Sequence, residues 1–297
     1  MPLHRWSYLS VVASAVNLLS INSHVAYGHV GNAAAVFALQ RLGCEVWPVH
    51  TALFSNHAGH GSFRGEMVEA SAVGDLMRGI EERGVLARCD GVLSGYLGRT
   101  ETGEAILEAF AKVKAANPAA RYCCDPVIGD AGRGVYVRAG IPEFLRERAV
   151  PAADVLTPNQ FELEHLSGGT APTLAALLAA ADALAARGPR AILVTSVVTE
   201  ETPKDCIDLI AWEPAGRFRL RTPRLPVAVH GAGDAVAALF FAHWLRTGSA
   251  AEALSRAASA IFGVLQKTAD QGADEMLLID AQEELVKSSR MFWAEPV

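Results

Sequence analysis

The sequence is poor in the patterns that mark several common protein classes. It has 297 residues and a net charge of −6 at pH 7, with no clustered basic stretch, so it lacks the electrostatic signature of a nucleic-acid-binding protein. No run of like charges predicts a disordered tail. The number of cysteines is odd, and no two of them have Cys-x-x-Cys spacing, so they predict neither a disulfide framework nor a zinc site. The five cysteines are Cys44, Cys89, Cys123, Cys124 and Cys206.

The chain also lacks an apolar run long enough to span a bilayer, which takes about 20 residues. Arg5 precedes an apolar stretch over residues 8–21, and this order resembles a short signal peptide. The signal pattern is incomplete, and cleavage beyond Ile21 would remove a predicted core strand. We therefore expect no membrane association and a cytoplasmic location, because free thiols suit a reducing compartment.

Three sequence motifs are missing. There is no Gly-x-Gly-x-x-Gly of dinucleotide-binding proteins and no Gly-x-x-x-x-Gly-Lys-Ser/Thr of Walker-type kinases. The histidines of the first 60 residues lack the i, i+4 spacing with a glutamate that zinc proteases use. We expect them to line a pocket or the surface rather than to form a metal cluster: His24, His29, His50, His57 and His60.

What the sequence does contain is a regular alternation of apolar runs and helical patterns. Apolar residues make up 51% of the chain, which is typical of a globular protein with a sizeable core. Strands are predicted at residues 17–21, 44–49, 90–94, 121–125, 154–156 and 191–195, and an antiparallel hairpin at 207–212 and 217–221. Helices are predicted at residues 32–42, 68–84, 106–113, 174–186, 235–246, 251–269 and 281–287. The alternation predicts one α/β domain whose mostly parallel sheet is covered by helices on both faces.

In such a sheet, ligands bind outside the carboxyl ends of the strands. These ends are expected at residues 22–24, 50–51, 94–96, 125–127, 157–159 and 195–196. The polar groups of residues 23–32 would suit an uncharged or weakly charged polar ligand. Alternatively, Asn32 simply caps the helix that follows.

The strongest local feature is the segment His230-Gly231-Ala232-Gly233-Asp234, which precedes a helical run. Glycines let the backbone approach a ligand closely, and the free amides of a helix N-terminus favour an anion. A carboxylate in the same turn can accept a proton from an attacking hydroxyl, so the segment is suited to phosphoryl transfer. The alternative is a glycine-rich turn in which Asp234 only caps the helix.

Two further segments follow predicted strands. In residues 157–162, Asn159 and Glu162 have the spacing of a capping box, or Glu162 holds Mg²⁺ through water. After Asp125, the glycine-rich residues 128–137 could fold over nucleotide phosphates as a lid. Asp130 in this segment also fits a plain surface turn.

Taken together, six ordered segments resemble the pyridoxal kinases of the ribokinase-like superfamily. They are residues 21–32, 46–61, 93–98, 124–130, 157–164 and 231–234, and the match extends over nearly the whole chain from Asn17 onward. The resemblance implies a single-domain ribokinase-like fold for residues 17–297, with residues 1–16 as an N-terminal extension. It also implies ATP-dependent phosphorylation of the 5′-hydroxymethyl group of pyridoxal, a step of vitamin B6 salvage.

The resemblance further implies roles for individual residues. Asp234 would be the catalytic base, and Gly231, Ala232 and Gly233 would supply amides to the anion hole. Asp125 and Glu162 would order Mg²⁺ and the phosphates of ATP. A monovalent cation such as K⁺ would lie beside Thr157, Thr195 and Ser196 in the nucleotide site. The protein would be a homodimer. The substrate would contact Ser23, Thr51, Ala52 and Tyr96. The nucleotide would contact Thr157, Thr195, Ser196, Arg224, Leu225, Pro226 and Val227.

Three positions depart from the family pattern. The family usually has glutamine at Asn22 and tyrosine at His60, and often asparagine at His230. If Asn22 and His60 line the ring pocket, the KM for pyridoxal should be raised, and the change Asn22→Gln with His60→Tyr should lower it. The alternatives to a pyridoxal kinase are a hydroxymethylpyrimidine kinase, a non-catalytic vitamin B6 carrier and, with less support, a sugar kinase.

Overall fold

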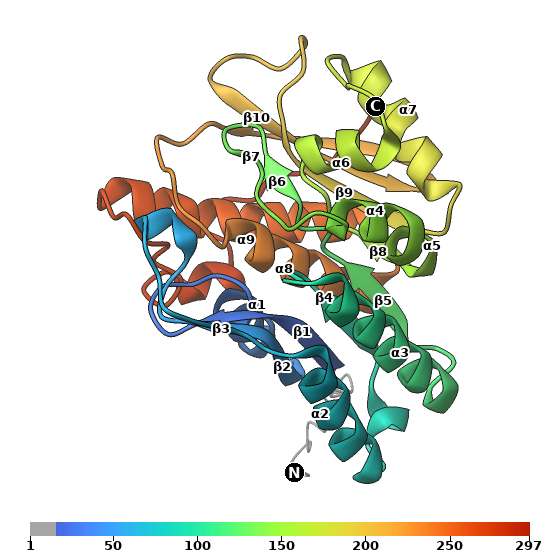
Figure 1. Ribbon diagram of the computed structural model, residues 1–297. Helices are drawn as coiled ribbons and strands as arrows, with labels where there is room; N and C mark the ends of the chain where they lie inside the picture. The colour runs from blue at the N-terminus through green and yellow to red at the C-terminus, as the bar shows by residue number, and fades with distance from the viewer. Residues whose placement is uncertain (1–15) are drawn as a thin grey trace, which may run out of the picture.

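The framework of the protein is one ten-stranded sheet, seen in the computed structural model, which describes residues 16–297 (Figure 1). Residues 1–15 lie outside the described residues. The expectations for Arg5 and for the N-terminal extension therefore concern residues that the structure does not describe, apart from residue 16. From one edge to the other the strands are β12 (Glu295–Pro296), β11 (Gly216–Pro223), β10 (Cys206–Glu213), β9 (Ala191–Val197), β8 (Val155–Leu156), β5 (Arg121–Cys124), β4 (Gly91–Ser94), β1 (Asn17–Val25), β2 (Glu45–Phe54) and β3 (Gly65–Met67).

The centre of the sheet is parallel and its edges are antiparallel. The parallel part consists of six strands that pair with one another in the order β2, β1, β4, β5, β8 and β9. Strands β10 and β11 form an antiparallel hairpin whose register sets Leu209 opposite Leu220, and β10 pairs antiparallel with β9. The predicted parallel sheet with an appended hairpin is therefore confirmed.

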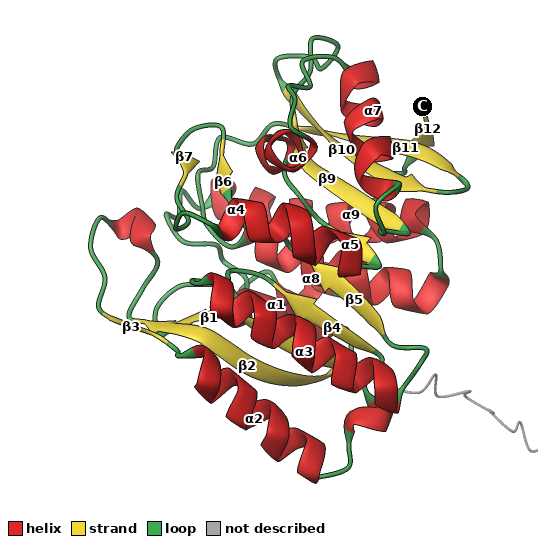
Figure 2. Cartoon of the chain, turned by 45° about the vertical axis from the view of Figure 1, so that its right-hand side comes forward, coloured by secondary structure: helices red, strands yellow, loops and turns green. Residues whose placement is uncertain are grey.

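Helices cover both faces of the sheet (Figure 2). One face carries α1 (Asn32–Arg41), α8 (Ala232–Thr247) and α9 (Ala250–Asp270). Leu18 belongs to the core beneath these helices and Leu19 to the core on the other face, so β1 is buried on both sides, as its apolar run predicts. The second face carries α2 (Ala70–Glu82), α3 (Thr100–Ala116), α4 (Ile141–Phe144), the π-helical turn η3 (Leu145–Ala149), α5 (Val150–Ala152), α6 (Gln160–Ser167) and α7 (Leu174–Ala185).

Three local predictions are wrong. Residues 281–287 form only a short 3₁₀ turn, η4 (Gln282–Leu285). Strand β2 continues to Phe54 instead of ending at residue 49, because its last residues pair with β3. Helix α1 begins after Gly31, which makes no side-chain cap bond, so Asn32 lies inside the helix and does not cap it.

The carboxyl ends of the parallel strands open toward three connecting segments. They are the turn η1 (Ala58–His60) after β2, the small hairpin of β6 (Gly129–Asp130) and β7 (Gly134–Val135) after β5, and the N-terminus of α8. The turn η2 (Leu86–Arg88) precedes β4. The fold thus brings most of the predicted motif segments to one side of the sheet.

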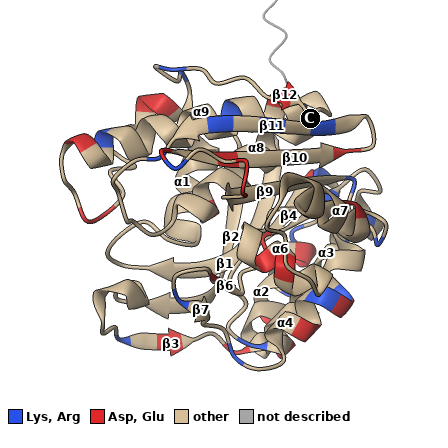
Figure 3. Ribbon diagram, turned by 90° about the horizontal axis from the view of Figure 1, so that it is seen from above, with Lys and Arg blue, Asp and Glu red and all other residues tan. Residues whose placement is uncertain are grey.

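The surface carries charged residues of both signs. Seen from above, acidic and basic positions are interspersed along the elements (Figure 3). Between residues 16 and 297, none of the helices has both the length and the apolar character needed to cross a bilayer.

Candidate functional site

A cavity of about 870 Å³ lies at the carboxyl ends of the strands. Eleven of the residues singled out from the sequence line it: Ser23, Tyr96, Asp125, Thr157, Glu162, Thr195, Ser196, Gly231, Ala232, Gly233 and Asp234. They come from six separate segments of the chain, so the fold assembles what the sequence keeps apart. Their catalytic and binding roles remain predictions.

Asp234 lies in the first turn of α8 and is held by residues of the β1–α1 region. Its Oδ1 accepts a hydrogen bond from Nδ2 of Asn22 at 2.9 Å, and it also accepts one from the backbone N–H of Gly31. Burial raises the pKa of Asp234, while these two hydrogen bonds oppose the shift. The cap of α8 is Gly231, without a side-chain cap bond, so the alternative that Asp234 only caps the helix is wrong.

The turn before α8 depends on a glycine at residue 231. Gly231 has φ 86°, a left-handed conformation that L side chains rarely adopt. A Cβ added there would lie 1.6 Å from the carbonyl oxygen of His29. The turn therefore sits directly on the loop between β1 and α1, and the first residues of α8 line the cavity together with Asp234.

Asp125 and Glu162 form the acidic wall of the cavity. Oδ1 of Asp125 accepts a hydrogen bond from Oγ1 of Thr157 at 2.9 Å. Burial, with repulsion from Glu162 and Asp234, raises the pKa of Asp125 well above its usual range. Burial also raises the pKa of Glu162 to about 7.

Glu162 has a structural duty in addition to its place in the cavity. It completes the capping box of α6 with Asn159, so that alternative is confirmed. Its Oε2 accepts from the N–H of Asn159 at 2.9 Å, and its Oε1 accepts from those of Ile128 at 2.9 Å and Gly129 at 3.4 Å. One side chain thus fixes both the start of α6 and the base of the β6–β7 hairpin.

The cavity offers carboxylate oxygens to a hard divalent cation. Three acidic groups line it, Asp125 and Glu162 buried and Asp234 half-buried, and repulsion from Glu162 and Asp234 contributes to the raised pKa of Asp125. A bound cation would relieve this repulsion, and carboxylate oxygens are the ligands that Mg²⁺ prefers. Because Glu162 already accepts three N–H bonds, Asp125 has the more available oxygens, and Glu162 is better placed to act through water.

The β6–β7 hairpin reaches the cavity through its own side chains. Asp130 accepts hydrogen bonds from the backbone of Gly132 and Arg133, as expected of a turn residue. The guanidinium of Arg133 pairs with Asp130 and lies 5.0 Å from the centre of the Tyr136 ring. Asp130, Arg133 and Tyr136 all line the cavity, so the turn and the predicted lid are the same segment.

A second cavity of about 350 Å³ adjoins the first and shares four lining residues with it: Thr195, Ser196, Ala232 and Gly233. Arg224, Leu225 and Val227 line it as well, whereas Pro226 does not. Ser196, with φ 54°, is the one non-glycine residue of the described chain that has a positive φ. Strained conformations of this kind cluster at ligand sites.

Two predicted substrate residues do not reach the cavity surface. Thr51 and Ala52 lie inside β2 and are buried, and Oγ1 of Thr51 donates to the carbonyl oxygen of Tyr96 at 2.6 Å. The expected contact of these two residues with substrate is therefore corrected: both lie behind the residues that form the cavity wall. The cause is the length of β2, which continues past the predicted strand end.

The premise that Asn22 and His60 line the ring pocket is also wrong. Asn22 is 2% exposed and turns toward Asp234, while His60 turns toward Glu275. His57, His60 and Glu275 form a compact cluster, whereas the sequence predicted no grouping of this kind. Glu275 has no motif around it, and its partners lie more than 200 residues away, so no sequence signal identifies it.

Comparisons with known proteins agree with one another. The family model described as phosphomethylpyrimidine kinase matches residues 31–277. The pyridoxal kinase PdxY of Granulibacter bethesdensis is 54% identical over 284 residues, which cover 94% of this chain and 99% of that protein. PdxY of Rubrobacter xylanophilus is 54% identical over 272 residues, which cover 91% of this chain and 94% of that one. The structure of pyridoxal kinase from Leishmania donovani in complex with ADP and pyridoxine has a TM-score of 0.88 at 26% identity, covering 95% of this chain and 99% of that one.

Proposed function

The chain belongs to the pyridoxal kinase family, and on that premise we propose that it transfers the γ-phosphoryl group of ATP to the 5′-hydroxymethyl group of pyridoxal. The product would be pyridoxal 5′-phosphate. The single observation that carries the proposal is the position of Asp234. It is a half-buried carboxylate in the first turn of α8, in the same cavity as Asp125 and Glu162.

Asp234 would accept the proton of the substrate hydroxyl as that oxygen attacks phosphorus. A carboxylate whose pKa is raised by burial is a stronger base than an exposed one. Asn22 and the Gly31 N–H hold the carboxylate in place, so one oxygen can face the substrate. The negative charge of the transferring group would be stabilised by the amides of residues 231–234 at the N-terminus of α8.

ATP and a divalent cation are the cofactors of this chemistry. We propose Mg²⁺ as the cation, with Asp125 as the closer carboxylate and Glu162 acting through water. A cation held there would supply positive charge to offset that of the phosphates. A monovalent cation such as K⁺ is proposed beside Thr195 and Ser196, where the positive φ of Ser196 turns the backbone at the junction of the two cavities.

The nucleotide base is proposed to occupy the smaller cavity. Its lining is largely apolar and includes Arg224, Leu225 and Val227, which suits a flat, weakly polar ring. Thr157, Thr195 and Ser196 would then contact the phosphates between the base and Asp234. Pro226 keeps a role only in shaping the segment that holds its neighbours.

The setting of the activity is proposed from the remaining features. Residues 17–297 would form one kinase domain and residues 1–16 an extension, with two copies forming a homodimer. A cytoplasmic location is supported by the cysteines, which are free thiols, four of them buried. The reaction would serve vitamin B6 salvage.

A competing acceptor is hydroxymethylpyrimidine, because the matching family model bears the name of a phosphomethylpyrimidine kinase. A non-catalytic vitamin B6 carrier is less consistent with a carboxylate in the first turn of the helix that begins at the cavity. The test is a phosphorylation assay of the purified protein with pyridoxal, pyridoxine, pyridoxamine and hydroxymethylpyrimidine. The proposal expects the highest kcat/KM with pyridoxal. A far higher value with hydroxymethylpyrimidine would change the substrate, and no turnover of any acceptor would favour the carrier.

A further inference from the structure

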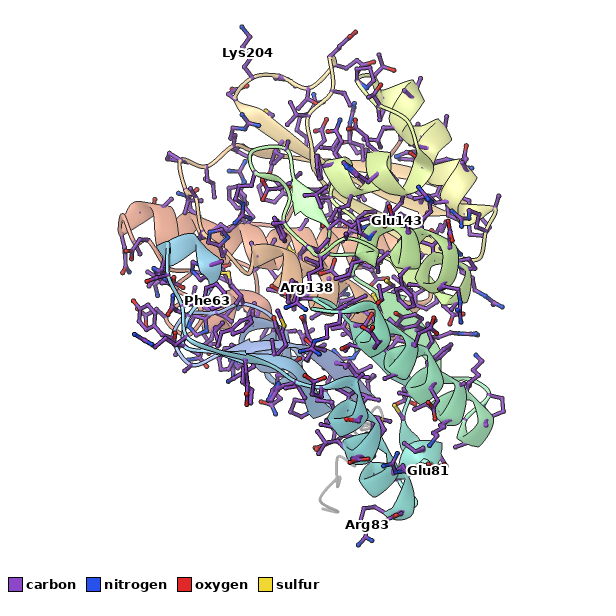
Figure 4. All side chains as sticks on the ribbon, viewed as in Figure 1. Phe63, Glu81, Arg83, Arg138, Glu143 and Lys204 are labelled. Carbon is purple, nitrogen blue, oxygen red and sulfur yellow. The ribbon has the colours of Figure 1, made fainter. Side chains whose placement is uncertain are left out.

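The carboxylate of Glu275 joins two parts of the chain that are far apart in sequence. Its Oε1 lies 2.7 Å from Nε2 of His57 and 2.8 Å from Nε2 of His60. Glu275 follows α9, whereas the histidines belong to residues 55–64, which we call the flap. The flap lies beside the C-terminal end of α9 (Figure 1). Phe63, labelled in Figure 4, belongs to the flap.

The hydrogen bonds of His57 define its tautomer. The backbone N–H of Gly59 donates to Nδ1 of His57 at 3.1 Å, so Nδ1 carries no proton. Nε2 of His57 therefore carries the proton and donates it to Glu275. Glu275 thus orients the His57 ring as a hydrogen-bond acceptor. With Gly59 bonded to Nδ1 and Glu275 bonded to Nε2, one ring orientation satisfies both hydrogen bonds.

The same contacts argue against a metal ion in this cluster. A metal would need the lone pair of Nε2, which carries the proton of His57 as long as Gly59 donates to Nδ1. The rings of His57 and His60 are also stacked, with centroids 4.2 Å apart and planes at 27°. The cluster is therefore built for hydrogen bonding.

The flap is connected through His57 to the catalytic turn. The ring of His57 lies 4.3 Å from the ring of His230, the residue before Gly231. Gly59 packs so closely on His230 that an added Cβ would lie 2.3 Å from its Nε2. His57, Gly59 and His230 all line the cavity that contains Asp234. The flap thus forms a wall of the cavity and rests on the segment that leads into the anion hole.

Glu275 is itself held from the opposite side. A Cβ added to Gly28 would lie 2.5 Å from its Oε2, so the carboxylate fits against the β1–α1 loop without room for a side chain. Its side chain is only 13% exposed, in contrast to the 83% of Glu283 on the same C-terminal segment. A carboxylate with so little freedom is a fixed point for the flap.

We propose that Glu275 is a positioning residue for the acceptor substrate: by accepting from His57 and His60, it holds the flap closed as a wall of the substrate cavity. The inference rests on the proposed function for its kinetic consequence, since the substrate is the one that the kinase phosphorylates. It assigns Glu275 no contact with ATP and no part in proton transfer.

The kinetic test compares Glu275→Ala with Glu275→Gln, which keeps an acceptor oxygen at the same place. We expect Glu275→Ala to raise the KM for pyridoxal roughly tenfold, the effect of losing about one hydrogen bond to a charged group. The kcat and the KM for ATP should change little, because the flap binds substrate and transition state alike. Glu275→Gln should recover most of the loss. The matched control is Glu283→Ala, which removes an exposed carboxylate paired with Arg41 and should leave all constants unchanged.

A second measurement does not depend on activity. Hydrogen exchange of residues 55–64 should become faster in Glu275→Ala and stay unchanged in Glu283→Ala. His60→Ala removes one of the two donors and should speed exchange in the same direction, which keeps the test available if Glu275→Ala does not fold. If the wild-type protein phosphorylates no pyridoxal, the proposed function fails, while this comparison still decides the inference.

Three results would overturn the proposal. The first is unchanged flap exchange in Glu275→Ala. The second is a rise of the KM values for ATP and pyridoxal by the same factor, which would indicate a general structural effect. The third is calorimetric binding of one Zn²⁺ by the wild type, without nucleotide, that Glu275→Ala abolishes; the cluster would then be a metal site.

Discussion

Nδ2 of Asn22 lies 2.9 Å from Oδ1 of Asp234, across 212 residues of sequence. The amide oxygen of Asn22 accepts from the backbone N–H groups of Ser23 at 2.8 Å and Tyr96 at 2.9 Å. All three contacts are satisfied within the protein, so Asn22 fixes the orientation of the proposed base. The sequence predicted that glutamine at residue 22 would lower the KM for pyridoxal. The contact with Asp234 predicts a lower kcat instead.

Asn22→Gln should lower kcat and should not lower the KM for pyridoxal. The added methylene has no room, because Gly95 packs directly on the Asn22 amide, and overpacking a buried site costs about 1–3 kcal/mol of stability. We expect kcat to fall about tenfold as Asp234 loses its partner. Steady-state kinetics with pyridoxal check this. A lower KM with unchanged kcat would instead restore the view that residue 22 contacts substrate.

Asp234→Asn should remove activity and keep the fold. Loss of a general base typically lowers kcat by about 10²–10⁴-fold. The neutral amide also ends the repulsion between residue 234 and Asp125, so the free energy of unfolding should not fall. The measurements are kcat, ATP affinity by calorimetry and the melting temperature. Near-normal kcat in a pure preparation would remove Asp234 from the mechanism.

Glu162→Gln should weaken the use of the divalent cation. Glutamine has a single acceptor oxygen, so at least one N–H among those of Ile128, Gly129 and Asn159 loses its partner. The Mg²⁺ concentration for half-maximal activity at fixed ATP should rise about 10–100-fold, as for other residues that orient a metal ligand. Glu147→Gln, an exposed change of the same kind, is the control. Superimposable titrations would leave Glu162 with its capping role alone.

Residues 128–137 should close over the nucleotide. The base of this lid is anchored by Glu162 and by Nδ2 of Asn159, which donates to the carbonyl of Gly129 at 2.8 Å. Its tip, residues 131–133, is exposed, and Arg133 there would exchange its pairing with Asp130 for phosphate. Hydrogen exchange in residues 128–137 should slow when Mg²⁺ and a non-hydrolysable ATP analogue are added. Unchanged exchange there, with protection elsewhere around the cavity, would disprove the lid.

The contribution of Glu162 to the stability of the free protein should fall as the pH rises from 5 to 8. The pKa of Glu162 is raised to about 7 in the folded state, so the stability linked to its proton is fully present below pH 4.5 and is lost as the pH rises through 7. Glu162 alone accounts for a loss on the order of 3 kcal/mol. Urea unfolding of the wild type and Glu162→Gln measures this: the free energy of unfolding of the variant, relative to that of the wild type, should rise with pH. Equal slopes would place the titration elsewhere.

Much of the site was predictable because its residues lie in short motifs at strand ends. The glycines and carboxylate of residues 231–234 mark a helix N-terminus, and the structure places that N-terminus in the cavity. The spacing of Asn159 and Glu162 predicts the capping box that is present. The parallel sheet follows in the same way from apolar runs that are buried on both faces.

What the sequence does not indicate depends on contacts between distant segments. The continuation of β2 past residue 49 depends on its pairing with β3, and this pairing places Thr51 and Ala52 behind the cavity wall. Glu275 has no local pattern, since its surroundings are formed by the flap and the β1–α1 loop. Asn22 follows the predicted strand at residues 17–21, and only the fold shows that it lies within β1 and turns toward Asp234 rather than toward a ligand.

The contact of Gly231 with the carbonyl of His29 has a consequence for the order of folding. The catalytic turn and the loop that supports it are separated by about two thirds of the chain, as are Asn22 and Asp234. Bringing together residues so far apart in sequence has a high entropic cost, which slows this step of folding. The contacts between Gly231 and His29 and between Asn22 and Asp234 form only after it. Local helices and hairpins can form earlier without this step. During refolding from denaturant, recovery of enzymatic activity should therefore lag behind recovery of helical circular dichroism.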